Sequence, residues 1–174
     1  MIQFAFTVRE ILQMWHSPHG DLDADVMAID GSLSRTDTTV LSGRVFPTLS
    51  IGEQARVSLA RVLAQEAPLL LLDEPIAALD LRHQQIVMDI AHDLANSGKT
   101  IVVILLDLNL AAAVADRIVL LQDGRIAACG TPWEVMTKPI LEQVFECKIQ
   151  VTTHPQMDSP LVLPLMSVRN PVMP

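Results

Sequence analysis

Residues 49–80, LSIGEQARVSLARVLAQEAPLLLLDEPIAALD, place a helix entrance, a helix, a strand and an acidic turn in immediate succession. Ser50 and Glu53 have the spacing of a capping box, which predicts a helix that begins at Ile51. Gly52, in the first turn of that helix, leaves backbone N–H groups open to an approaching anion. The first half of the stretch therefore predicts a helix whose amino end can bind a negatively charged ligand.

The second half of the stretch predicts a strand that ends in two carboxylates. The run Leu69 to Leu72 is short, continuous and apolar, which favours a strand covered on both faces. Asp73 and Glu74 follow at its carboxyl end, where open α/β sheets bind their ligands. Two adjacent carboxylates at that end can hold Mg²⁺ and polarise an attacking water, the two tasks that phosphoryl transfer requires.

The composition excludes several classes of protein. The chain has 174 residues, which fits one domain, and it is 50% hydrophobic but only 3% aromatic, which suits an aliphatic α/β core. Its formal net charge is −8 and it has no basic cluster, so a nucleic-acid partner is not expected. Its longest apolar runs, such as residues 101–106, are far shorter than the ~20 residues that span a bilayer. We expect a cytoplasmic chain that reaches the inner face of the cell membrane through a partner.

Cys129 and Cys147 have no spacing that is typical of a metal site. Free thiols fit a reducing compartment, and we expect both side chains to be buried.

Capping residues and turn signals predict the other elements of the chain. The predicted helices begin after a capping residue or run at helical spacing, over residues 7–15, 22–29, 81–96, 108–115 and from Thr131 onward. A further strand is expected over residues 100–106, and a hairpin over residues 117–129 around Asp123 and Gly124. Prolines exclude a long helix after residue 146.

The opening stretch resembles three motifs of the ATPase subunits of ABC transporters. Residues 49–53 resemble their signature loop, residues 69–74 their Walker B strand and residues 77–80 their D-loop, in the family's order and spacing. The phrase Phe-Thr-Val-Arg-Glu at residues 6–10 and the segment 144–165 resemble the hemin and iron-chelate importers of that family. The resemblance implies an α/β chain with a partial P-loop NTPase (ABC ATPase) fold, in which a mostly parallel sheet is flanked by helices and joined to a helical subdomain.

The resemblance also implies an organisation and a set of partners. Residues 1–48 would form part of the helical subdomain, residues 49–146 the signature, Walker B, D-loop and H-loop part of the ATPase domain, and residues 147–174 a C-terminal extension. The implied cofactors are ATP and Mg²⁺. The implied partners are a transmembrane permease and a second ATPase subunit, with hemin or an iron chelate as the transported ligand.

Each candidate site residue takes its role from the resemblance. Asp73 would bind Mg²⁺, and Glu74 would be the base that polarises water. The signature residues Ser50, Gly52 and Glu53 would contact the ATP held by the opposing subunit. Asp80, in the D-loop, would act across the dimer.

The chain departs from the family pattern by the lack of a phosphate-binding loop and at two positions. The only Gly-Lys-Thr, residues 98–100, lies between a predicted helix and a predicted strand, which is the reverse of the order in a phosphate-binding loop. We therefore expect an N-terminally truncated form, unable to bind or hydrolyse ATP alone. Ile51 stands where the signature has its first glycine, and Leu106 stands where the family has its switch histidine.

Two hypotheses of different classes remain open. In the first, the chain is the ATPase subunit of a hemin or iron-chelate importer and hydrolyses MgATP with a partner copy. In the second, it is a non-catalytic remnant or a partner-binding module. A phosphate loop encoded in frame upstream would favour the first hypothesis, and a stop codon or frameshift there would favour the second.

Overall fold

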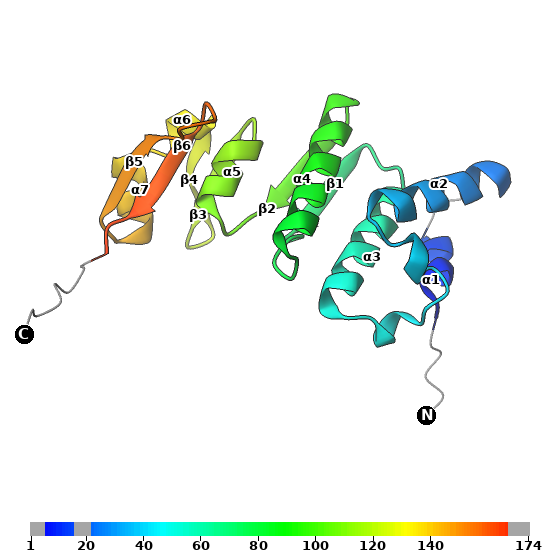
Figure 1. Cartoon of the computed structure of the whole chain (residues 1–174). Coiled ribbons are helices and arrows are strands. Elements are labelled where there is room, and N and C mark those ends of the chain that lie inside the picture. The colour runs from blue at the N-terminus through cyan, green and yellow to red at the C-terminus, as the bar shows by residue number, and fades with distance from the viewer. Residues whose placement is uncertain (1–5, 16–21, 167–174) are drawn as a thin grey trace, which may run out of the picture. The chain divides into compact units, whose positions relative to one another are not determined.

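The computed structural model describes residues 6–15 and 22–166 of the chain (Figure 1). It divides into two compact units, residues 1–104 and residues 105–174.

The first unit begins with a group of helices around one apolar core. These are α1 (Val8–Trp15), α2 (Leu22–Arg35) and α3 (Ile51–Ala64), with short 3₁₀ turns at η1 (Thr39–Leu41) and η2 (Phe46–Thr48). The core consists of small and aliphatic side chains from all three helices and the turns between them: Val8, Leu12, Ile29, Leu33, Leu41, Leu49, Val57, Ala60 and Ala64. Helix α2 runs six residues beyond the expected end at Ile29, because Leu33 continues its buried face one turn further on.

The rest of the first unit is a parallel strand pair with a crossover helix. Strand β1 (Leu69–Asp73) is followed by α4 (Leu81–Asn96) and β2 (Thr100–Ile104), and β1 pairs with β2 with Leu69 opposite Thr100. Helix α4 has the predicted bounds and packs against β2. The parallel pairing confirms the α/β class, and it brings the carboxyl ends of both strands to one edge.

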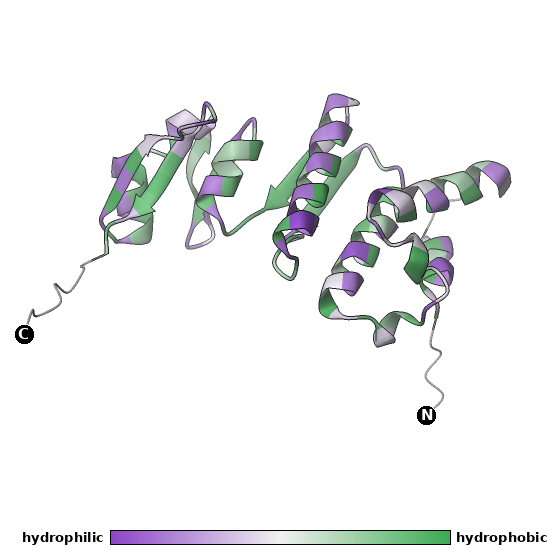
Figure 2. Ribbon diagram, in the orientation of Figure 1, coloured by the Kyte–Doolittle hydropathy of each residue, from purple (hydrophilic) through white to green (hydrophobic). Residues whose placement is uncertain are grey.

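The prediction that β1 is covered on both faces is wrong. Leu70 and Leu72 are buried, whereas Leu69 is 50% and Leu71 is 69% exposed. The same open face continues on β2, where Val102 is 48% exposed, and Figure 2 shows both strands in the hydrophobic colour. Among the described residues of this unit, α4 packs on one face of the pair and the opposite face stays apolar and open to solvent.

The second unit consists of two hairpins with short helices. Its elements in order are α5 (Leu108–Val114), β3 (Ile118–Gln122), β4 (Arg125–Gly130), α6 (Pro132–Val135), α7 (Lys138–Phe145), β5 (Ile149–Thr153) and β6 (Pro160–Pro164). Asp123 and Gly124 both have positive φ, 50° and 72°, as the type I′ turn predicted between β3 and β4 requires. The antiparallel pair β5 and β6 occupies the proline-bearing segment in which no long helix was expected.

The expectation that the cysteines are buried is also wrong. Cys129 and Cys147 are both free and exposed. Cys129 lies on the outward face of β4 because the alternation along that strand buries Gly130 instead. None of the helices in the described residues is long and apolar enough to cross a bilayer.

Candidate functional site

The amino end of α3 is built as the sequence predicts. Ser50 is the N-cap, and its hydroxyl accepts a hydrogen bond from the backbone N–H of Glu53 at 3.3 Å. In return, the backbone N–H of Ser50 donates to Oε2 of Glu53 at 2.7 Å. The reciprocal pair fixes the direction in which the first turn of α3 presents its free N–H groups.

The carboxylate of Glu53 is occupied within its own chain. Its second oxygen, Oε1, accepts from Nη1 of Arg44 at 3.1 Å. The backbone N–H of Ser50, followed by the Ser50 hydroxyl and the charges of Arg44 and Arg56, holds the pKa of Glu53 below its ordinary value of 4.5. Glu53 therefore stays ionised near neutral pH and secures the loop that carries Ser50.

Gly52 lies against the acidic turn that follows β1. A Cβ added to Gly52 would approach the backbone oxygen of Ala78 to 3.2 Å, closer than most Cβ contacts. Glycine is thus the residue that lets the entrance of α3 reach the backbone of residues 77–80 without displacing it. Two segments that the sequence separates by a helix and a strand meet at this point.

Asp80 begins α4 in the same way that Ser50 begins α3. Its Oδ1 accepts from the backbone N–H of His83 at 2.9 Å, and Nδ1 of His83 lies 2.7 Å from the same oxygen. These two contacts hold the pKa of Asp80 below its ordinary value of 3.8, and the backbone N–H of His83 has the larger effect. The carboxylate is therefore charged and oriented at the helix entrance.

Two glutamines complete these entrances, and sequence reasoning missed both. Nε2 of Gln54 donates to the carbonyl oxygen of Leu49 at 3.0 Å, and Nε2 of Gln84 donates to that of Leu79 at 3.1 Å. Each glutamine stands four residues after the N-cap of its helix, so the recurrence of that spacing after Ser50 and Asp80 is the signal that could have revealed them.

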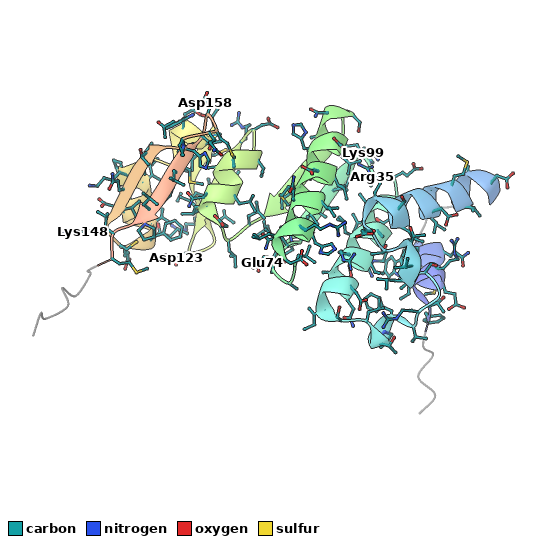
Figure 3. All side chains as sticks on the ribbon, in the orientation of Figure 1. Arg35, Glu74, Lys99, Asp123, Lys148 and Asp158 are labelled. Carbon is teal, nitrogen blue, oxygen red and sulfur yellow. The ribbon has the colours of Figure 1, made fainter. Side chains whose placement is uncertain are left out.

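Asp73 and Glu74 occupy the carboxyl end of β1, and both are exposed. Glu74, labelled in Figure 3, has a left-handed backbone with φ 44°, and its N–H donates to the carbonyl oxygen of Ile104 at 3.1 Å. A non-glycine residue in this conformation is uncommon and is often found at functional sites. No sequence pattern indicates this backbone conformation.

The two carboxylates fit Mg²⁺ only as part of a shared site. Within the described residues, no group of three or more His, Cys, Asp or Glu side chains could hold a metal ion. Mg²⁺ usually keeps several waters and is bound by one or two carboxylates together with phosphate oxygens. Asp73 and Glu74 supply hard oxygen ligands of this kind, so they suit a metal that arrives with a nucleotide.

The two positions that depart from the family pattern both face solvent. Ile51, the first residue of α3, is 75% exposed, so its branched side chain projects beside the free N–H groups of the helix. Leu106 belongs to the second unit and is 76% exposed. An apolar side chain at either place offers no hydrogen-bond donor to an anion.

Known proteins match nearly the whole chain. The family model described as "ABC transporter" matches residues 5–77. A hemin import ATP-binding protein of Streptomyces coelicolor is 49% identical over 166 residues, which cover 94% of this chain and 59% of the relative. A hemin import ATP-binding protein of Mesorhizobium japonicum is 42% identical, with 96% of this chain and 68% of the relative covered. The chain therefore spans about three fifths of the length of the first of these relatives.

A solved structure agrees with the fold over almost the whole chain. It is an inward-facing metal-chelate type ABC transporter, which aligns with a TM-score of 0.77 at 28% identity. The alignment covers 95% of this chain and 69% of that chain.

Proposed function

Since the chain belongs to the ABC transporter family of ATP-binding proteins, we propose that it carries the signature helix, the Walker B strand and the D-loop of an importer's ATPase subunit. We propose hemin or another iron chelate as the transported ligand. Hemin is the ligand named in the description of the relatives that the chain matches. Residues 1–48, 49–146 and 147–174 then correspond to part of a helical subdomain, the ATPase segment and a C-terminal extension.

The observation that carries this proposal is the contact of Gly52 with the backbone of Ala78. Helix α3 and strand β1 lie between these two segments in the sequence, and their fold brings the helix entrance and the acidic turn together. In this arrangement Ser50 and Gly52 offer N–H and hydroxyl groups to the phosphates of an ATP bound by a second subunit. Glu53 holds that entrance in place, and Asp80 lies beside it for contact across the dimer.

Asp73 and Glu74 take the roles of metal ligand and base. Asp73 would hold Mg²⁺ together with the nucleotide's phosphate oxygens, and the metal would neutralise charge on the transferred phosphoryl group. The carboxylate of Glu74 would accept the proton of the attacking water. Its backbone N–H, bonded to Ile104, keeps the residue fixed at the end of the sheet while its side chain stays exposed.

The proposed partners are a second ATPase subunit and a transmembrane permease. They would place the chain at the cytoplasmic face of the membrane. The open apolar face of β1 and β2 is consistent with a chain that folds against further protein.

ATP binding by this chain alone is proposed to be weak. Its 174 residues contain no Gly-rich loop with a lysine between a strand and a helix, so most of the triphosphate's charge would be unmet. A non-catalytic, partner-binding role is the second candidate, and the exposed Ile51 and Leu106 are the observations that favour it.

Calorimetry with MgATP tests the proposal. The chain is compared with a fusion in which a family-like segment that carries the phosphate loop and the Q-loop precedes Met1. We expect binding by the fusion and none by the chain, because the fusion gives Asp73 and Glu74 a bound triphosphate to face. Micromolar binding by the unfused chain would contradict the proposed weakness, and a well-folded fusion that fails to bind would contradict the proposed function.

A further inference from the structure

A network of four polar side chains connects the loop after α2 with the entrance of α4. Nη1 of Arg82 donates to Oδ2 of Asp37 at 3.0 Å, and the same nitrogen lies 3.3 Å from Nε2 of His83. Nδ1 of His83 lies 2.7 Å from Oδ1 of Asp80. Asp37 precedes Arg82 by 45 residues, so the loop and the helix entrance are joined by tertiary structure rather than by sequence.

The donors and acceptors of this network fix which ring nitrogen of His83 carries the proton. A guanidinium has only donors, so Nε2 of His83 must accept where it meets Arg82. The proton of the neutral imidazole then lies on Nδ1, from which it is donated to Asp80. A second proton on Nε2 would turn an N–H towards the donors of Arg82, and Oδ2 of Asp37 is too far, at 3.8 Å, to accept it in a hydrogen bond.

Asp37 is a fixed point of the first unit. Its neighbours Thr36 and Thr38 are buried, and their hydroxyls are 2.8 Å apart. Asp37 itself has φ 55°, a left-handed conformation that Asp tolerates better than most residues. Its backbone oxygen accepts from Nη1 of Arg56 in α3 at 2.6 Å, so the same residue holds both α3 and α4.

We propose that Asp37, Arg82 and His83 are positioning residues that orient Asp80, and that His83 does so with a proton on Nδ1. The inference rests on the proposed function in treating Asp80 as a site residue. It adds a mechanical link, because a displacement of the loop at Asp37 is passed through Arg82 and His83 to the D-loop carboxylate. The charged groups that face His83 are Asp80, Asp37 and Arg82, and Arg56 lies 3.9 Å from the same Oδ2 of Asp37.

The tautomer of His83 tests the proposal directly. Two-dimensional ¹⁵N NMR of the full chain at neutral pH distinguishes an imidazole protonated on Nδ1 from one protonated on Nε2. We expect Nδ1–H to be the major form of His83, although a free histidine side chain prefers the other tautomer. In Arg82→Met, and in Asp37→Ala, which releases Arg82, the share of Nδ1–H should fall, because Nε2 has lost the donor that required it to accept, while Asp80 still accepts from Nδ1.

A loss of stability alone would not lower the share of Nδ1–H in a chain that stays folded. Arg82 is 68% exposed at its side chain, so Arg82→Met should fold, and His92 in the same helix is an internal reference whose spectrum should not change. The pKa of Asp80 should rise in Arg82→Met but stay below 3.8, because the charge of Arg82 is lost and Nδ1 donates less often, whereas the backbone N–H of His83 still donates. His83→Asn, whose amide can donate from the place of Nδ1, should keep the pKa of Asp80 low.

A His83 without a proton on Nδ1 in the parent chain would overturn the proposal. So would an unchanged share of Nδ1–H in both Arg82→Met and Asp37→Ala. None of these measurements uses nucleotide, so their outcome is separate from the success or failure of the proposed ATPase function.

Discussion

Gln54 and Gln84 make the same pair of hydrogen bonds at the entrances of consecutive long helices. Each donates to the carbonyl of the residue before the N-cap, and each approaches a second carbonyl four residues before the N-cap, that of Phe46 or Ile76. Both side chains are half-buried. The two glutamines therefore hold the proposed signature loop and the proposed D-loop against their own helices by the same pair of hydrogen bonds.

Replacing these glutamines should loosen the loops. In Gln54→Met or Gln84→Met the side chain keeps its length but loses its donor, and a partly buried carbonyl loses its partner. We expect each change to lower the free energy of unfolding by about 1 kcal/mol or more. Chemical unfolding followed by circular dichroism measures this, with Gln85→Met at the exposed neighbouring position as the matched control. Equal stability of the three variants would show that the two hydrogen bonds contribute nothing.

The open face of the strand pair predicts self-association. Leu71 and Val102 are neighbours on that face, since Leu71 is paired with Val102 in the ladder and both are exposed. Exposed apolar strands are templates for association with other chains. In sedimentation velocity, we expect the chain to form oligomers and Leu71→Lys to reduce them markedly, without loss of secondary structure.

Met27→Lys is the control for that experiment, because Met27 is 74% exposed on α2 rather than on the sheet. It should leave the oligomers as they are. A monodisperse, cooperatively melting monomer of the parent chain would contradict the prediction.

Local signals predicted the helices well, and long-range packing explains what they missed. The capping pairs that start α1, α3 and α6, and the Asp80 cap of α4, depend on residues three positions apart, so the sequence displays them directly. The exposure of Leu69 and Leu71 could not be predicted in this way, because an apolar run does not reveal whether one or both faces of its strand are covered.

The same distinction between local signals and long-range contacts applies to the candidate site. Asp73 and Glu74 at the end of a strand, and Ser50 with Glu53 at a helix entrance, follow from adjacent residues. The link from Asp37 to Arg82 depends on a tertiary contact across 45 residues, and the left-handed backbone of Glu74 depends on its bond to Ile104. Neither leaves a periodic or capping signal in the sequence.

Acidification should weaken the chain through its capping boxes. The pKa values of Glu10, Glu53 and Glu134 all lie below 4.5, in each case first because of the backbone N–H of the N-cap residue. A carboxyl whose pKa is lowered on folding stabilises the fold at pH values above its unfolded pKa, and that stability is lost as the pH falls through the folded value. We expect the free energy of unfolding to change little between neutral pH and 4.5 and to fall below it.

Glu53→Gln separates the charge of one box from its hydrogen bonds. Glutamine can still accept from the Ser50 N–H, but it cannot be protonated in this range. Unfolding curves measured at a series of pH values should show a smaller acid-induced loss for Glu53→Gln than for the parent chain. An identical pH dependence would mean that the ionisation of Glu53 is not linked to folding.

The last prediction separates the absence of a phosphate loop from the departures at Ile51 and Leu106. In the fusion that supplies the phosphate loop and Q-loop, binding should return but hydrolysis should stay slow, because Ile51 crowds the anion-binding entrance and Leu106 offers no donor. Both defects concern contacts that matter most as charge develops in the transition state. One such contact is typically worth ~3 kcal/mol, or about a hundredfold in rate.

Adding Ile51→Gly and Leu106→His to the fusion should therefore raise steady-state ATPase turnover by about tenfold or more, with a much smaller change in ATP affinity. Glu74→Gln in the same background should abolish the gain, because it removes the proposed base while keeping the size of the side chain. Equal turnover with and without the two reversions would show that Ile51 and Leu106 are not lesions. Turnover that survived Glu74→Gln would show that Glu74 is not the base.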